Sequence, residues 1–199
     1  MNYEVVPAFS VPIGIAKVDH ELCEPIKNFK GIAQGVKGLD FNVLDKAPEI
    51  KKELIKIFTD FMNLHVLNSS EQEYTITTSW ITENNSGASM TRHNHKNSFY
   101  SSVLYFDEVT QDHPPLLFEN PFNNSGFYIE IKNPNQFTGE TFTAPIAKGL
   151  ILFFPSYMFH FHQPFMPTNI SRKSLACNYI PIGKYGISDS SFDTRKIHE

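Results

Sequence analysis

The amino-acid sequence predicts a mainly β protein with helices near the N-terminus packed outside a sandwich or barrel of strands. Short strand-like runs separated by Gly, Asn and Pro follow one another from residue 71 onward. Aromatic residues make up 14% of the chain, and such large flat side chains fill the interior of a β-sandwich well. At 199 residues the chain suits one domain. We expect N-terminal strands and helices in 1–70, a β core in 71–182 and a polar tail in 183–199.

Two elements are expected before the core. Residues 5–18 read as one or two short strands interrupted by Pro7 and Pro12, and prolines of this kind are confined to sheet edges. Such an edge could pair with a second subunit, so a homodimer is possible. Residues 19–33 read as a short helix that Asp19 could cap.

Residues 44–67 carry the clearest helical pattern. Asp45 and Pro48 mark its beginning. Apolar side chains recur at steps of three and four and share one face: Ile50, Leu54, Ile57, Phe58 and Phe61. This helix is expected to pack on a sheet and to take no part in chemistry.

The strands of the core are predicted from alternation and from turn residues. From Tyr74 to Trp80, β-branched and aromatic residues alternate with a period of two, and a turn follows at 84–87. Six further strands are expected, at 99–106, 116–118, 127–131, 136–144, 150–154 and 174–180.

Charge and cysteine content exclude some classes of function. The net charge is −4 and no cluster of Lys or Arg is present, so a nucleic-acid partner is unlikely. Cys23 and Cys177 lie far apart, which is typical of reduced thiols in the cytoplasm. Neither a signal peptide nor an apolar run of membrane-spanning length is evident, so no membrane association is expected.

Three histidines are the candidate metal ligands. His93 and His95 are two residues apart, a spacing that on a strand directs both side chains to one face. His160 ends a strongly apolar run and can supply a ligand from another strand. The ordered set of clustered and distant histidines predicts a non-heme iron site, although three histidines also suit zinc or copper.

The third ligand is left open by the sequence. The usual iron triad has two histidines and one carboxylate, and His95 stands where the carboxylate would be. Glu119 or Asp107 could supply that carboxylate instead, with His95 outside the metal's immediate ligands. His162 follows His160 on the same face of a continuing strand, as a runner-up ligand or a pocket residue.

A second group predicts a carboxylate anchor. Arg172 presents a planar fork that binds a carboxylate through two parallel hydrogen bonds. Ser174 would face the same side of its strand, and Asn178 continues that face. Together they could hold the distal carboxylate of a 2-oxo acid. Tyr100 is a further candidate for the lining of this pocket.

The order of these residues resembles a family of bacterial and phage 2-oxoglutarate/Fe(II) oxygenases, most of them uncharacterised. The resemblance spans nearly the whole chain and rests on Trp80, Gly87, His93-x-His95, Asn97-Ser98-x-x-Ser101-x-Val103-x-Tyr105, Gly149-x-x-x-x-Phe154-Pro155-Ser156-x-x-x-His160 and Arg172-x-Ser174-x-x-x-Asn178. Lys96 and Ser102 depart from the family's pattern of Pro and Gly. The resemblance implies a double-stranded β-helix (jelly roll, cupin-like) with outer helices.

The function expected from residues and resemblance is that of a non-heme iron dioxygenase, most simply a hydroxylase, that uses Fe(II), 2-oxoglutarate and O₂. Its catalytic residues would be His93, His95, His160 and Arg172, and its substrate a small molecule or a protein side chain. Two alternatives remain open. One is a three-histidine cupin-type dioxygenase without 2-oxoglutarate, and the other is a non-catalytic jelly-roll binding or virion-associated module.

Overall fold

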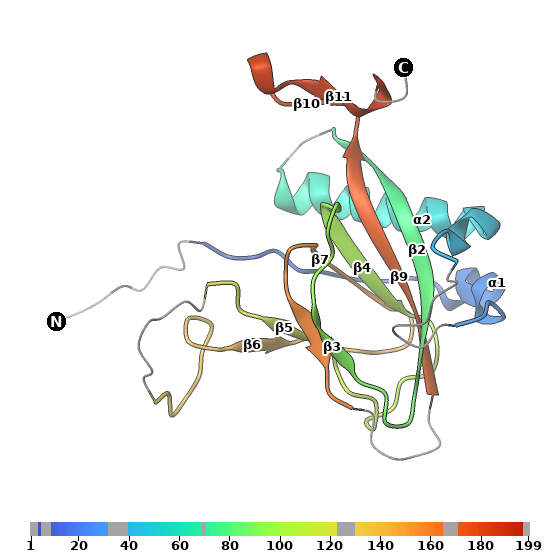
Figure 1. Ribbon diagram of the computed structural model, residues 1–199, viewed down its shortest axis with the longest axis vertical. Coiled ribbons are helices and arrows are strands. Elements are labelled where there is room, and N and C mark those ends of the chain that lie inside the picture. The colour runs from blue at the N-terminus through green and yellow to red at the C-terminus, as the bar shows by residue number, and fades with distance from the viewer. Residues whose placement is uncertain are drawn as a thin grey trace.

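Two antiparallel β-sheets packed face to face form the body of the protein (Figure 1). The computed structural model describes residues 4, 9–31, 40–68, 71–122, 130–164 and 171–196. The large sheet has the order β1-β7-β4-β9-β2 and the small sheet the order β3-β8-β5-β6. The large sheet consists of β1 (Gly14–Lys17), β2 (Glu73–Asn85), β4 (Tyr100–Tyr105), β7 (Leu150–Pro155) and β9 (Ser171–Ile182). The small sheet consists of β3 (Met90–His93), β5 (Leu117–Glu119), β6 (Thr141–Thr143) and β8 (His160–His162).

Helices cover the outer face of the large sheet (Figure 1). The predicted helix at 44–67 is divided into three pieces: the 3-10 helix η2 (Val43–Lys46), α2 (Pro48–Asp60) and the π-helical η3 (Phe61–Val66). Pro48 occupies the first turn of α2, where its missing N–H costs nothing. The predicted apolar face is confirmed, because Ile50, Leu54 and Phe58 are buried.

The Phe58 ring anchors α2 to the sheet. It packs against Tyr74 of β2, Tyr100 of β4 and Tyr179 of β9, with centroid distances of 4.9, 5.5 and 4.3 Å. Phe153 of β7 lies 5.3 Å from the same ring, so four strands of the large sheet share one helical side chain.

A second core lies between the sheets. Tyr105, Leu152 and Phe154 from the large sheet meet Phe118 of β5 and Met158 there. The centroids of Phe118 and Phe154 are 4.8 Å apart. The site described below occupies the same interlayer space, where polar side chains replace these apolar ones.

Several predicted elements are shorter in the structure. In the described part of 19–33 the helix is reduced to η1 (His20–Cys23) and α1 (Glu24–Lys27), and within 9–18 only β1 is a strand. Most of the strand predicted at 127–131 lies outside the described residues. In 136–144 only β6 is a strand, because the Asn135 side chain accepts hydrogen bonds from the Phe137 backbone and the Thr138 hydroxyl and holds a turn instead.

The predicted polar tail contains a small hairpin. β10 (Lys184–Tyr185) pairs with β11 (Phe192–Asp193), and η4 (Ser188–Ser190) and η5 (Thr194–Lys196) accompany it. The rings of Tyr185 and Phe192 lie 4.7 Å apart, which gives the hairpin an apolar contact of its own. None of the helices in the described part of the chain is long and apolar enough to cross a membrane.

Candidate functional site

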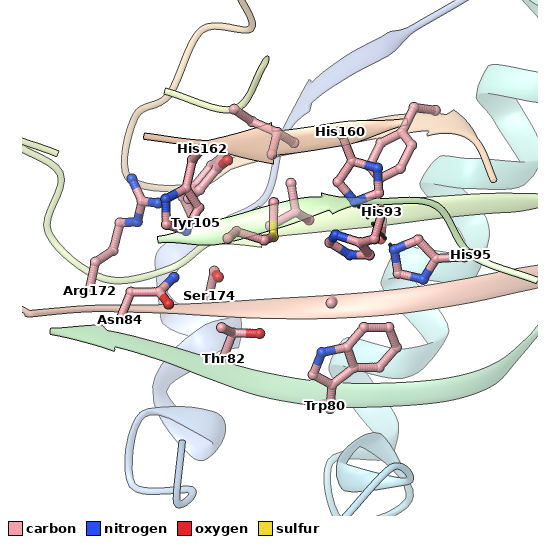
Figure 2. A pocket seen from close by; sticks show the side chains of 16 residues that line it. Trp80, Thr82, Asn84, His93, His95, Tyr105, His160, His162, Arg172 and Ser174 are labelled. Atoms are coloured by element: carbon pink, nitrogen blue, oxygen red, sulfur yellow. Dashed lines mark hydrogen bonds between the residues drawn. The ribbon is translucent and has the colours of Figure 1, made fainter. Parts of the chain in front are cut away.

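His93, His95 and His160 converge at one point between the two sheets (Figure 2). His93 ends β3, His95 follows in the next loop, and His160 begins β8 as the direct cross-strand partner of His93. One ligand atom from each residue lies within 4.8 Å of the others, and the Nε2 atoms of His95 and His160 are 3.4 Å apart. The histidines that the sequence singled out therefore form a cluster with the dimensions of a metal site.

Backbone carbonyls fix the orientation of two of these rings. Nδ1 of His93 lies 2.8 Å from the carbonyl oxygen of Thr91, and Nδ1 of His160 lies 3.0 Å from that of Met158. A carbonyl oxygen can only accept, so each Nδ1 carries the proton and donates. Each Nε2 is then left with a lone pair, which is the tautomer that a metal-binding histidine needs.

Asn178 is the side-chain neighbour of His95. Its amide partly offsets the effect of burial on the pKa of His95, while Nε2 of His95 faces His160. The amide of Asn178 is itself held, because its Nδ2 donates to the Thr78 hydroxyl at 2.9 Å and its Oδ1 accepts from the Ser101 hydroxyl at 2.8 Å. Asn178, which the sequence suggested as a co-substrate ligand, thus lies beside the metal cluster, and its co-substrate role stays a prediction.

Burial keeps two rings of the cluster neutral by lowering their pKa values. It lowers the pKa of His160 to about 3 and that of His95 to about 4, and the neighbouring histidines add to both shifts. Neutral imidazole is the form that binds a metal ion, so both rings are ready for ligation at neutral pH.

Neither carboxylate proposed from the sequence reaches this cluster. Glu119 forms an ion pair with Arg92, and Asp107 accepts a hydrogen bond from the backbone N–H of Lys173 at 3.2 Å. Within the described ranges, the three histidines are the one group with metal-site spacing, and it includes no carboxylate. The geometry therefore favours His95 as the third ligand.

A cavity of about 150 Å³ extends from the histidines between the sheets. Figure 2 shows the three imidazoles at one end and Arg172 at the other, with Ser174 between them on β9. The wall is mostly apolar, and Tyr105 and Phe154 contribute to it. Polar groups are concentrated at the two ends, as expected of a site that fixes the orientation of a small ligand.

Arg172 supplies a buried positive charge. The side chain is 2% exposed, its Nη1 donates to the Pro114 carbonyl at 3.2 Å, and the guanidinium lies 4.9 Å from the centre of the Tyr105 ring. Burial lowers the pKa of Arg172, yet a guanidinium stays charged throughout the physiological range. Ser174 is two residues away and lines the same cavity, as the spacing predicted.

His162 is a pocket residue, one of the two roles expected for it, whereas Tyr100 does not line the cavity as expected. His162 lines the cavity beside Arg172, with its Nδ1 directed at the Gln163 carbonyl at 2.8 Å, and it does not join the metal cluster. Tyr100 faces the opposite side of β4 and packs on Phe58 in the outer core. Alternation along β4 was recognised in the sequence, but not which of its faces borders the site.

Sequence reasoning missed the wall that β2 contributes. This wall consists of Trp80, Thr82 and Asn84. Each is the cross-strand neighbour, within the same sheet, of a cavity residue on β9: Ala176, Ser174 and Arg172 respectively. The Trp80 ring stacks 5.6 Å from that of His95. The spacing of Trp80, Thr82 and Asn84 by two residues was visible in the sequence. That spacing does not tell which face of β2 borders the cavity. Ser102, one of the two departures from the family pattern, also borders the cavity, and its hydroxyl bonds that of Tyr179 at 3.1 Å.

Comparisons with known structures agree on the fold. A prolyl-4-hydroxylase from Pseudomonas putida superimposes with a TM-score of 0.53 and 15% identity over 85% of this chain and 88% of its own. HygX from Streptomyces hygroscopicus, crystallised with nickel and 2-oxoglutarate, gives 0.55 and 9% over 85% and 82%. The epimerase SnoN from nogalamycin biosynthesis, described as non-heme and α-ketoglutarate dependent, gives 0.52 and 10% over 89% and 83%. The jelly-roll fold predicted above is thereby confirmed.

One family model matches the sequence, over residues 78–178, and its description is "Putative 2OG-Fe(II) oxygenase". The matched half of the chain contains all three histidines, Arg172 and Ser174. No curated protein matches the chain. The donor set fits the cofactors of that family, because three oriented nitrogen ligands suit iron and a buried arginine suits a dicarboxylate. The chain belongs to the 2OG-Fe(II) oxygenase family, whose members are oxidoreductases that use iron and 2-oxoglutarate.

Proposed function

We propose that the protein is a hydroxylase in which His93, His95 and His160 hold the iron. Arg172 and Ser174 bind the distal carboxylate of 2-oxoglutarate, whose 2-oxo acid end faces the histidines. The observation that carries this assignment is a single cavity with three clustered imidazoles at one end and a buried guanidinium at the other. Two of the imidazoles, those of His93 and His160, are left with an Nε2 lone pair for a metal.

The protein's own contribution is to bind and orient the metal and the co-substrate and to exclude water from the site. Iron and 2-oxoglutarate, when bound, supply the activation of O₂ and the oxidising power. Arg172 fixes one end of the co-substrate through its rigid fork, so that the other end meets the metal in one orientation. The apolar walls around Tyr105 and Phe154 exclude water and strengthen the electrostatic contacts inside. Thr91, Met158 and Asn178 hold the imidazoles in place.

The substrate is proposed to be a small molecule or an amino-acid side chain of a protein. Trp80 lines the cavity beside His95, and the partly exposed Phe41 meets its ring edge-on at 5.9 Å, so an aromatic surface extends outward from the metal cluster. Such a surface suits an apolar or ring-shaped group next to the oxidised C–H bond. The prolyl-4-hydroxylase and HygX, the latter also crystallised with hygromycin B, illustrate the two classes among similar folds.

The cysteines and the net charge bear on the compartment and the partners of the protein. Both cysteines are buried and free, which supports a reducing compartment such as the cytoplasm. The net charge of −4 continues to disfavour nucleic acid. A homodimer stays a prediction, and sedimentation equilibrium would test it.

The first experiment is an anaerobic titration of the Fe(II)-loaded protein with 2-oxoglutarate, followed by the visible metal-to-ligand charge-transfer band. Arg172→Ala should abolish or greatly weaken the band, because no other buried cation is available in the described cavity. The control is Arg195→Ala, which removes an exposed arginine in the C-terminal hairpin.

Two results would contradict the proposal. Iron binding without a band in the wild type would favour a three-histidine dioxygenase that needs no 2-oxo acid. A wild type that binds no iron would argue that the cluster has lost its metal function.

A further inference from the structure

Asn84 occupies the end of the cavity that holds Arg172. The two residues are direct cross-strand partners on β2 and β9, and Thr82 and Ser174 form the next pair toward the histidines. All four line the cavity. Figure 2 shows the Asn84 amide projecting into the space beside Arg172 and Ser174. The Arg172 end of the cavity is therefore built from two strands, whereas the sequence identified only the contribution of β9.

The Asn84 side chain is largely buried, and its amide opens into the cavity. Its exposed fraction is 5%, and its amide makes no hydrogen bond within the described part of the chain. A primary amide offers two N–H donors and one oxygen acceptor, and in a small cavity these groups favour a polar partner. An amide kept in this state at the wall of a cavity indicates a ligand that completes its hydrogen bonds.

The charge of the neighbourhood identifies the ligand chemistry. The Arg172 guanidinium makes this end of the cavity positive, and a carboxylate has about four acceptor sites to fill. The amide of Asn84 adds a hydrogen-bond donor without adding charge. The single negative charge of a bound carboxylate is therefore still balanced by the single positive charge of Arg172. Four residue steps along β2, from Asn84 to Trp80, span about 13 Å of strand and separate this end from the histidine beside Trp80.

We propose that Asn84 is a ligand of the co-substrate, with its Nδ2–H donating to the distal carboxylate held by Arg172 and Ser174. The inference rests on the proposed function and adds a second strand to the anchor. It makes Asn84 a determinant of selectivity for a dicarboxylic 2-oxo acid.

The test measures binding directly, by calorimetric titration of the Mn(II)-loaded protein with 2-oxoglutarate. Asn84→Asp replaces the donor with a second carboxylate at the same volume, and Asn84→Leu removes all hydrogen bonding. Both should weaken 2-oxoglutarate binding roughly ten- to hundredfold, the range expected for a hydrogen bond to a charged group. The control is Asn85→Asp, the same chemical change one residue along β2 at an exposed position, which should alter the affinity less than about twofold.

Two further readouts separate ligand contact from structural support. Mn(II) affinity should be unchanged in all three variants, because Asn84 lies at the far end of the cavity from the histidines. The ligand-free Asn84→Asp protein should melt no lower than the wild type, since its new carboxylate faces Arg172, and 2-oxoglutarate should no longer raise that melting temperature. A merely structural role would lower the ligand-free melting temperature and the Mn(II) affinity together, and would overturn the inference.

The remaining outcomes distinguish this inference from the function on which it rests. If Arg172→Ala weakens 2-oxoglutarate binding while both Asn84 variants bind it within twofold of the wild type, Asn84 is not a ligand and the proposed function stands. If the Mn(II)-loaded wild type does not bind 2-oxoglutarate, the proposed function fails and takes the inference with it.

Discussion

The three imidazoles of the site have two kinds of partner, backbone carbonyls and a side chain. His93 and His160 donate to backbone carbonyls, which no side-chain substitution can remove. His95 instead has the side chain of Asn178 as its neighbour, and this contact can be removed by mutation. The sequence located all three histidines from their spacing. It did not reveal the role of Asn178, because the partner of a buried amide is set by packing between strands.

Asn178→Ala should weaken metal binding by roughly ten- to hundredfold, as loss of an outer hydrogen-bond partner typically does. Co(II) titration monitored by its visible spectrum would measure both the affinity and the ligand geometry. Ser174→Ala is the matched control, because it should weaken 2-oxoglutarate binding and leave Co(II) affinity intact. Equal Co(II) affinity in Asn178→Ala and the wild type would show that His95 needs no such support.

At the scale of elements, long periodic segments were predictable and short polar ones were not. The apolar face of α2 and the alternation along β2 were both visible in the sequence. β3 and β8, which carry His93 and His160, have only 4 and 3 residues and no alternating apolar pattern. β3 and β8 become strands because they pair with each other although they are distant in sequence. Local β-propensity therefore does not predict them.

The separation of α2 from the site leads to a stability prediction. Phe58 is fully buried between α2 and the large sheet, so Phe58→Ala should cost about 3–5 kcal/mol of unfolding free energy. Chemical denaturation would measure the loss, with Phe122→Ala, at an exposed position, as a control that changes little. Metal affinity of the folded variant should be unchanged, because α2 packs on the face of the sheet away from the histidines. A parallel loss of metal affinity would contradict this separation of roles.

At the scale of the whole molecule, buried histidines make stability depend on pH. His113 is 5% exposed, and burial and the nearby Arg172 lower its pKa, against weaker opposing effects of Asp107 and Asp112. Its Nδ1 accepts a hydrogen bond from the Thr110 backbone N–H at 2.9 Å, which requires the neutral ring.

The unfolded chain binds the His113 proton near pH 6.5, whereas the folded chain does so only at lower pH. The stabilising contribution is thus complete above about pH 6.5 and is lost as the pH falls toward the folded pKa. His113→Asn keeps an acceptor for Thr110 but does not titrate. Its unfolding free energy, from urea titrations between pH 7 and 5, should fall less than that of the wild type. Identical pH slopes would refute this.

The pairing of β3 with β8 has a consequence for the path of the chain. His93 and His160 are cross-strand neighbours although 67 positions separate them in sequence, 160 minus 93. An ion shared by both would act as a reversible cross-link that closes this long loop, and closure of a long loop restricts the unfolded chain most. Metal binding would therefore stabilise the pairing of β3 with β8 in the small sheet. The imidazoles that bind the ion would then contribute to folding stability as well as to the reaction.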